Sequence, residues 1–472
     1  MHIIDILIIC LYLMVILGVG FYFFKKNKDI DEYFVGGRKM SSLHIGLSVV
    51  ATDVGGGFSI GLGGLGFVMG VSGSWLLFTG LVGAWMSGIF LIPLVSKVAR
   101  ERNFYSFPQF LEYIFDRRVA LIAGVISAIG YLGFTSSQIL AGAKLASSTF
   151  EGLTLDQALL VMGEITVVYT VFGGIKAVIY TDTIQWIILM GGLTLIGLPF
   201  AYHSIGGMEA IRETLAPAFL KLNNVSWQQL VNWAFTIIPI WFVGMTLYQR
   251  IYAARDTKTA RKAWFIAGLF EYPLMAFIGA LLGMFARVAL DQGVITGYTI
   301  ANIDPEMGLP LLLKTVLPVG LLGLVISAYF SAIMSTADSC MMASSGNILT
   351  DVIRKHESVN SLRYSQVLTF TIGATALVLA MSMENVLELM LHSYAFMVAG
   401  MFIPVVAALV HKRPNPVAAL FSMVTGGALA LGLIPFADDL PMGLDPIVFG
   451  IAGGASAYLL VIFIAGRRKQ ST

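Results

Sequence analysis

Charged residues are scarce in this sequence. Asp, Glu, Lys and Arg make up 12% of its 472 residues, whereas hydrophobic residues make up 57%, and the mean hydropathy is +0.84. A soluble domain of this length needs a more polar surface, so the composition excludes a soluble protein and is typical of a membrane protein with many spans. The formal net charge of +2 is small, and we expect no nucleic-acid partner.

Cysteine is rare and the common catalytic motifs are missing. The two cysteines, Cys10 and Cys340, both lie in apolar runs, which excludes a disulfide framework and a metal site with cysteine ligands. The chain has no HExxH, no paired Cys and His ligands and no nucleophile elbow. We therefore expect that the protein is not an enzyme.

Long apolar runs dominate the chain. The first run is too long for the core of a signal peptide and no small-residue cleavage site follows it, so we expect a retained helix. The run 310–349 is too long for one straight crossing, and we expect it to tilt or to continue beyond the bilayer as a helix. We predict thirteen membrane spans, at about residues 3–24, 42–70, 74–98, 118–148, 156–172, 178–203, 228–249, 262–290, 310–349, 363–383, 386–408, 416–434 and 445–466.

Lys and Arg are distributed unevenly between the connections. With the amino terminus outside, the inner connections hold 24 of the 29 Lys and Arg residues, Arg250 among them. The chain then ends inside, on Arg467, Arg468 and Lys469. Because positive residues are retained on the inner side, this distribution predicts an outer amino terminus and a cytoplasmic carboxyl terminus.

Spans two to six and seven to eleven form two sets of five. Because each set has an odd number of spans, the second set would be inverted relative to the first. Span two contains Gly55–Gly57, and span seven contains Pro239 and Gly244, which weaken a helix near mid-membrane. Unwound backbone at that depth lines a cavity, where its carbonyl groups can bind a cation. Close packing of helices through small residues is the alternative explanation.

A polar face marks the apolar run around Ser327–Ser345. Its hydroxyls and one carboxylate share about half of the helix surface, and such a face in hydrocarbon needs a partner. Ala332, Ser335 and Thr336 are spaced i, i+3 and i+4, so their oxygens share a face. A sodium ion is hard and takes about five or six oxygens, and the carbonyls freed by the break in span two can complete the set. We predict a main sodium site at Ala51, Val54, Ala332, Ser335 and Thr336.

Ionisable residues inside spans are functional candidates by default. Asp53, Asp182 and Asp338 lie beside hydroxyls or broken backbone, so we expect them to take part in cation coupling. A proton carried by one of these aspartates is the alternative to sodium as the coupling ion. For three further residues the alternative is an ion pair or hydrogen bond that only holds helices together: Glu164, Glu271 and Lys144.

Several segments of the sequence resemble the sodium/solute symporter family, which includes proline, pantothenate, sugar, sialic acid and choline symporters. They are DEYFVGGRKM (31–40), ATDVGGG (51–57), GGIKAVIYTDTIQ (173–185) and AIMSTADS (332–339). The resemblance covers nearly the whole chain and implies an all-α, LeuT-like fold with five plus five inverted helices, one helix before this core and two after it. It divides the chain into a leading helix at 1–30, a first repeat at 42–203, a second repeat at 228–408, and two trailing helices with a cytoplasmic tail at 416–472.

The resemblance also implies roles for individual residues. It places the main sodium site on the five residues named above. It assigns a second cation site or coupling role to Asp53, Asp182, Asp338 and Ser339. It implies a solute pocket among Gly56, Gly57, Phe58, Trp75, Phe134, Gln138, Trp241, Met245 and Tyr394, the last as a lid. Proline-type members have a tryptophan and a tyrosine where Gly57 and Met245 stand, which argues against proline itself.

The resulting hypothesis is a sodium-coupled symporter that imports a small organic solute by alternating access. We expect one or two sodium ions, a multi-pass location in the bacterial inner membrane, contact with the lipid bilayer and a monomeric functional unit. The alternatives are a proton-coupled transporter of the same fold and a proline-like amino acid carrier. The sequence does not identify the solute.

Overall fold

The computed structural model describes the chain except for residues 27–34, 54, 173–174, 355–359, 412–413 and 471–472. The described residues are mainly helical and form no β-strand beyond a single bridge between Met40 and Ala254. The helices of the first half are α1 (Ile3–Lys26), α3 (Ser42–Asp53), α4 (Gly55–Met69), α5 (Trp75–Phe90), α6 (Ile92–Arg102), α7 (Phe107–Ile114), α8 (Arg117–Thr149), α9 (Leu155–Phe172), α10 (Ile175–Gly192), α11 (Leu198–Ser204) and α12 (Gly207–Thr214).

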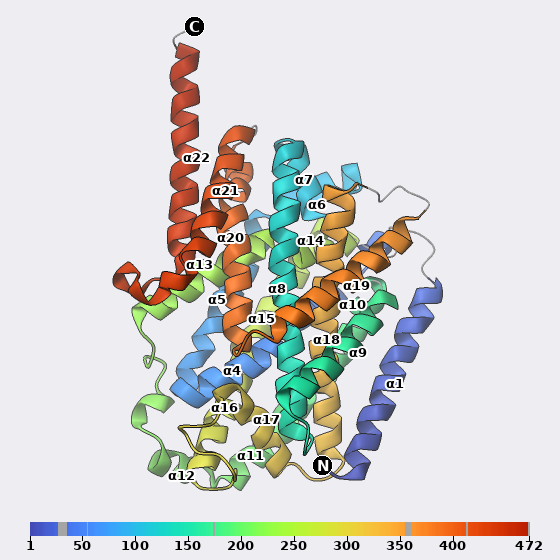
Figure 1. Cartoon of the computed structure of the whole chain (residues 1–472), viewed down its shortest axis with the longest axis vertical. Helices are drawn as coiled ribbons and strands as arrows, with labels where there is room; N and C mark the ends of the chain where they lie inside the picture. Colours follow the sequence, from blue (N-terminus) through green and yellow to red (C-terminus); the bar gives the residue numbers. More distant parts are fainter. Residues whose placement is uncertain (27–34, 54, 173–174, 355–359, 412–413, 471–472) are drawn as a thin grey trace.

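The second half is also helical. Its helices are α13 (Trp227–Val243), α14 (Met245–Ala253), α15 (Thr257–Leu269), the π-helical segment η5 (Phe270–Met275), α16 (Ala276–Asp291), α17 (Pro305–Val316), α18 (Leu321–Asn347), α19 (Ser361–Ala380), α20 (Val386–Val410), α21 (Pro416–Gly432) and α22 (Pro446–Gln470). In Figure 1, α8 and α18 run through the middle of the molecule, and α1 and α22 lie at its periphery. Side chains of α18 are buried along nearly its whole length.

The helices carry the composition of membrane spans. Among the described residues, seven helical segments are long and apolar enough to cross a membrane, and the bent pair of α13 and α14 adds an eighth. Large apolar side chains such as Leu195, Val378 and Leu459 are exposed on the outside of the bundle, where lipid would cover them. The protein is therefore an all-helical, multi-span membrane protein, and the count of thirteen spans stays a prediction.

Spans two and seven are both interrupted, as expected. Some of the residues that we expected to form the interruptions lie inside a helix beside them. Span two divides into α3 and α4 at residue 54, which lies outside the described residues, and Gly55 begins α4 with φ +38°. The triplet Gly55–Gly57 is therefore the first turn of α4, where it follows the break. Span seven bends by 42° between α13 and α14 at Gly244, whose backbone is extended (φ −66°, ψ 115°). Pro239 lies inside α13, so glycine and not proline marks this break.

The run 310–349 is not one tilted helix, contrary to the sequence prediction. It contains the end of α17 and the whole of α18, which are separated by Leu317–Gly320. Pro318 removes a backbone donor there, and Gly320 takes φ +88°, a conformation that favours glycine. The Asp5 carboxylate of α1 accepts hydrogen bonds from the N–H groups of Gly320 (2.7 Å) and Gly323 (2.9 Å). This contact caps the start of α18 and ties the leading helix to it.

Helices α4 and α16 pack against each other with their backbones in close approach. A Cβ atom at Gly283 would lie 1.9 Å from the carbonyl oxygen of Gly63, and one at Gly66 would lie 2.1 Å from that of Ala280. Only glycine allows the two backbones to approach so closely. The second half of the broken span two is therefore packed backbone to backbone against α16.

Candidate functional site

The break between α3 and α4 lies against the middle of α18. The Thr336 hydroxyl is within hydrogen-bonding distance of two carbonyl oxygens, those of Ala51 on α3 (3.1 Å) and Ala332 on its own helix (3.0 Å). A hydroxyl has one proton and two lone pairs, so this oxygen can turn its lone pairs toward a cation while the two carbonyls do the same. The structure thus brings together three residues of the predicted main sodium site. Val54 lies outside the described residues.

A small cavity adjoins two of these residues, Ala51 and Ala332. It measures about 10 Å³, which is about the space of one water molecule or one small ion. Gln185 on α10 is 2% exposed and lines the cavity, and its amide oxygen has no hydrogen-bond partner among the described residues. An orphaned buried oxygen beside carbonyl oxygens fits a hard cation. Sequence analysis included Gln185 as the last residue of the 173–185 motif but assigned no role to it. The lining is formed by Ala51, Gly55, Gln185, Trp186, Leu189, Met275 and Ala332.

Ser335, the fifth residue of the predicted site, points toward α10. Its hydroxyl donates a hydrogen bond to Oδ1 of Asp182, and Ser48 donates to Oδ2 at 2.5 Å. Asp182 is fully buried and also pairs with the guanidinium group of Arg250 on α14, at 3.4 Å. The Arg250 Nη2 atom donates to Ser339 as well, at 3.0 Å. Two residues of the predicted second cation site, Asp182 and Ser339, therefore meet around a guanidinium cation.

The location of Arg250 corrects the sequence analysis. The charge count placed it in an inner connection, but the structure buries it completely within α14. Besides Asp182 and Ser339, it donates to Thr52 Oγ1 (2.7 Å) and to the Thr246 carbonyl (3.3 Å). The side chain thereby joins four helices, α3, α10, α14 and α18.

Asp338, another acid of the predicted second cation site, has a different neighbour. Its Oδ1 atom accepts a hydrogen bond from Thr170 on α9, and Asp338 is 2% exposed. The described contacts therefore place the Asp338 carboxyl toward α9 and the Asp182 carboxyl toward α3 and α14.

Part of the predicted solute pocket comes together beside the break. The Tyr394 hydroxyl donates to Oδ1 of Asp53 at 3.3 Å, and the Tyr394 ring meets the Phe134 ring edge to face, with centroids 4.9 Å apart. Gln138 lies one turn further along α8, buried, with its amide nitrogen 3.3 Å from the Ser137 hydroxyl. Asp53, Phe134 and Tyr394 thus form one connected group at the end of α3.

The other predicted pocket residues have contacts elsewhere. Trp75 donates from Nε1 to the carbonyl of Leu222 in the connection before α13. Trp241 packs against the Trp264 ring at 6.3 Å, and the Met245 sulfur accepts from the N–H of Phe107 at 3.1 Å. None of these described contacts joins Phe134 or Tyr394. Gly56, Gly57 and Phe58 lie in the first turn of α4.

Tyr131 is a site residue that sequence analysis did not identify. Its hydroxyl accepts a hydrogen bond from the N–H of Thr246 (3.1 Å) and lies 3.0 Å from the Thr246 hydroxyl. Thr246 is the second residue of α14, after the break at Gly244, and the first N–H groups of a helix have no partner within their own helix. Tyr131 therefore caps the interrupted helix from α8.

Lys144, one of the residues with two open interpretations, forms a buried ion pair. Its ammonium group lies 2.5 Å from Asp304 and 2.6 Å from Glu306. Glu306 also accepts from the N–H groups of Val386 and Leu387 at the start of α20, each at 2.9 Å. Lys144 thus joins α8, α17 and α20, as the structural alternative proposed. The side chain of Glu164 is exposed on α9.

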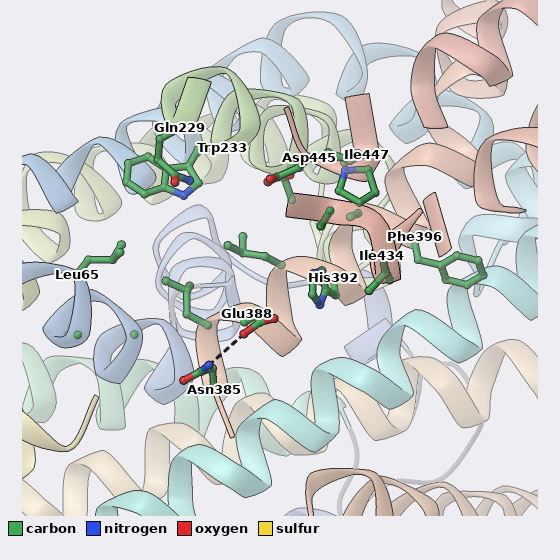
Figure 2. A pocket seen from close by; sticks show the side chains of 18 of the residues that line it. Leu65, Gln229, Trp233, Asn385, Glu388, His392, Phe396, Ile434, Asp445 and Ile447 are labelled. Atoms are coloured by element: carbon green, nitrogen blue, oxygen red, sulfur yellow. Dashed lines mark hydrogen bonds between the residues drawn. The ribbon is translucent and has the colours of Figure 1, made fainter. Parts of the chain in front are cut away.

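A larger cavity of about 470 Å³ lies between α4, α13, α20 and the start of α22 (Figure 2). Glu388, His392 and Asp445 contribute ionisable groups to its wall, and Glu388 accepts from the Asn385 amide at 3.0 Å. Partial burial raises the pKa of Asp445, and the nearby His392 opposes this shift. Gly61 and Gly64 of α4 form another part of the wall, so the cavity and the broken span share one helix.

The fold and these contacts can be compared with known proteins. A sequence model of the sodium:solute symporter family matches residues 33–426. The chain belongs to the sodium:solute symporter family. It is 27% identical to the high-affinity proline transporter PutP of Bacillus subtilis, over 96% of each chain. It is 26% identical to the sodium/pantothenate symporter of Escherichia coli, over 95% of this chain and 94% of that one.

Solved structures of transporters resemble the chain in fold. A Na+-coupled sialic acid symporter, solved in a substrate-bound outward-open state, aligns with a TM-score of 0.78 and 21% identity, over 97% of this chain and 96% of that one. A nucleobase-cation-symport-1 family transporter aligns with a TM-score of 0.51 and 14% identity, over 93% and 95%. These neighbours have the LeuT-like fold, and the family and its relatives are membrane transporters and not enzymes.

Proposed function

We propose that the protein is a symporter that couples one sodium ion to the import of a small organic solute by alternating access. The observation that carries this proposal is the Thr336 hydroxyl between the carbonyl oxygens of Ala51 and Ala332. A sodium ion at this place would be bound by neutral oxygens of α3 and α18, which keeps binding weak enough for release. The ion would also fix the interrupted backbone before α4 and preform the solute pocket beside Asp53.

A single sodium ion is supported by the surroundings of Asp182. In the predicted second site, Asp182 and Ser339 would bind a cation, and here both contact the guanidinium group of Arg250. The fixed positive charge of Arg250 balances the charge of Asp182, as a second sodium ion would. We therefore assign one transported sodium ion to the Thr336 site and a structural cation to the Asp182 site.

The free energy of one ion suffices for accumulation. Moving one charge through 100 mV provides about 2.3 kcal/mol. A tenfold sodium gradient adds about 1.4 kcal/mol. Together they allow a solute gradient of roughly several hundred-fold.

The proposal includes the topology expected from the sequence. The two five-helix repeats would extend over 42–203 and 228–408, with the amino terminus outside and the carboxyl terminus in the cytoplasm. The two interrupted segments, α3–α4 and α13–α14, stand at the start of the two repeats. Alternating access would then move these interrupted helices against α8 and α18, in the manner expected for inverted repeats.

Sodium binding by purified protein tests the proposal before the solute is known. Sodium chloride should raise the melting temperature more than potassium chloride at equal ionic strength, and Thr336→Ala should shift the sodium titration at least tenfold. Ser327→Ala is the matched control, because Ser327 is a hydroxyl of the same helix that donates to its own helix, at the Gly323 carbonyl (2.5 Å). Equal stabilisation by sodium and potassium would contradict the proposal. For any solute found, uptake into proteoliposomes at fixed sodium and varied pH separates sodium coupling from proton coupling.

A further inference from the structure

A basic cavity lies between α6 and the segment that follows α14. It measures about 170 Å³, which is about the volume of five or six water molecules. In Figure 1, α6 and α14 lie toward the end of the molecule to which α22 runs, and the topology predicted from the sequence places this end in the cytoplasm. The cavity shares no residue with the sodium site or with the larger cavity.

Three arginines from separate segments line this basic cavity. Arg38 belongs to the turn before α3, Arg100 to α6, and Arg255 to the connection between α14 and α15. Among the described residues, no acid lines the cavity. Like charges are thus gathered around one small space, and a concave site with charges of one sign attracts ligands of the opposite sign.

Most N–H groups of two of these arginines have no partner among the described residues. A guanidinium group has five N–H groups. Arg100 donates from Nη2 to the carbonyl of Ala254 at 3.3 Å, and Arg255 donates from Nε to the hydroxyl of Thr259 at 3.1 Å. Asp256 lies 3.6 Å from Arg255 Nε but already accepts from the N–H of Thr259 at 2.6 Å, where it caps α15. Both arginines therefore retain N–H groups for a ligand.

Contacts between distant segments fix the backbone around the cavity. The N–H of Met40 donates to the carbonyl of Ala253 at 3.0 Å, so the segment before α3 pairs with the end of α14. Arg38 donates from Nη2 to the carbonyl of Phe104, just beyond α6, at 3.0 Å. Arg38 takes φ +55°, a conformation uncommon for residues other than glycine and frequent at functional positions. The arginines are therefore held on segments that are already tied together, which lowers the cost of ordering them around a ligand.

We propose that this basic cavity binds a phosphate group. Arginine binds phosphate through paired N–H groups, and its planar side chain is well matched to phosphate oxygens. A phosphate monoester has three terminal oxygens and about 1.5 to 2 negative charges at pH 7. Several guanidinium groups match this charge better than they match the single charge of a carboxylate or a chloride ion.

Two sources carry a phosphate group at the cytoplasmic face. One is the headgroup of an anionic phospholipid, because the negative surface of the inner leaflet attracts basic segments and basic pockets between helices bind such headgroups. The other is a soluble phosphate ester. A phosphate group from either source would connect α6 to the segments before α3 and after α14, and a ligand that binds only the folded state raises its melting temperature.

Two pairs of probes test the inference on the full-length protein in a neutral detergent. Dioleoylphosphatidic acid is compared with dioleoylglycerol, and glycerol 3-phosphate with glycerol, because the members of each pair differ only by the phosphate group. Potassium salts at constant ionic strength replace sodium, so the result does not depend on the sodium site. The phosphate member of at least one pair should raise the melting temperature more than its neutral partner. A response to glycerol 3-phosphate identifies a soluble ester as sufficient, and a response confined to phosphatidic acid identifies the lipid.

Substitutions show whether the phosphate group binds in the cavity. Arg100→Gln together with Arg255→Gln should raise the half-maximal concentration of the active probe by at least about tenfold, because charged hydrogen bonds are lost. Arg255→Gln alone should raise it several-fold, and it keeps the fold because this side chain is 69% exposed. Arg261→Gln is the matched control, since Arg261 is an exposed arginine of α15 outside the cavity, and it should change the concentration less than about twofold.

Two results would overturn the inference. The first is equal stabilisation by the phosphate and neutral members of both pairs. The second is an equal shift in Arg255→Gln and Arg261→Gln, which would show only a general attraction of anions to the basic face. Neither result affects the sodium site, because these measurements contain no sodium.

Discussion

Replacing Arg250 with methionine tests whether a fixed cation occupies the Asp182 site. Methionine has a similar volume but no charge, so Asp182 keeps the hydrogen bonds from Ser48 and Ser335 and loses its only counter-charge among the described residues. Removing one partner of a buried ion pair costs about 3–5 kcal/mol. Since two hydroxyl donors remain, we expect a loss near the lower end, about 3 kcal/mol.

A double-mutant cycle isolates the pair. The free energy of unfolding would be measured in mixed detergent micelles for Arg250→Met, Asp182→Asn and the double variant. We expect the double variant to lose about 2 kcal/mol less than the sum of the single variants, because neither charge is then left alone. Arg287→Met is the control, since Arg287 pairs with Asp291 one turn away on the partly exposed face of α16 at 3.2 Å. Such a pair contributes only about 0.5 kcal/mol.

The same variant changes the sodium response. With Arg250 present, we expect the sodium titration to have a Hill coefficient near one. Arg250→Met leaves the Asp182 carboxylate available to a second sodium ion, so the coefficient should rise toward two and part of the lost stability should return at high sodium. A coupling energy near zero, or a wild-type coefficient of two, would refute the assignment of Arg250 as a structural cation.

Three further substitutions have expected outcomes. Gly55→Ala places a Cβ atom 2.4 Å from the Thr336 hydroxyl at φ +38°, so the midpoint of the sodium titration should rise at least tenfold, and a normal midpoint would count against the site. Lys144→Met should lower the free energy of unfolding by about 3–5 kcal/mol, with partial recovery when Glu306→Gln is added; no loss would show that the pair is not needed. Gln185→Leu should weaken sodium binding several-fold without loss of melting temperature, because it removes an orphaned buried oxygen; unchanged binding would exclude Gln185 from the ion's surroundings.

The spacing of residues along the sequence predicted the helices and the residues that share one face of a helix. Each apolar run contains a helix, because burial of apolar side chains in lipid and internal hydrogen bonding both require one. The spacing of Ala332 and Thr336 on α18 predicted a shared face, and both reach the Thr336 site with Ala51. The family was identified from short motifs that the comparison with known proteins confirmed.

Contacts between distant segments were not predictable in the same way. The charge count assumes that an arginine at the end of an apolar run is exposed to water. Arg250 is instead buried against Asp182, which lies 68 positions earlier in the chain. Lys144 pairs with Glu306, 162 positions later in the chain, and no spacing in the sequence joins them. The break between α17 and α18 had a local signal, since Pro318 and Gly320 stand together, but the apolar character on both sides concealed it.

The backbone contact between α4 and α16 has a mechanical consequence. Because no side chain separates the two helices at Gly63 and Gly283, they are expected to rotate together as one rigid body. Each has a residue with non-helical backbone angles at its near end: Gly55 (φ +38°) at the start of α4, and Tyr272 (φ −136°, ψ 127°) before α16. Asp53 precedes Gly55 by two positions, and Glu271 directly precedes Tyr272. The 15 residues of α4 form an arm of about 22 Å, and a turn of about 10° would move its far end by about 4 Å. A small change of backbone angle at Gly55 and Tyr272 would therefore widen or narrow the large cavity at the other end of α4.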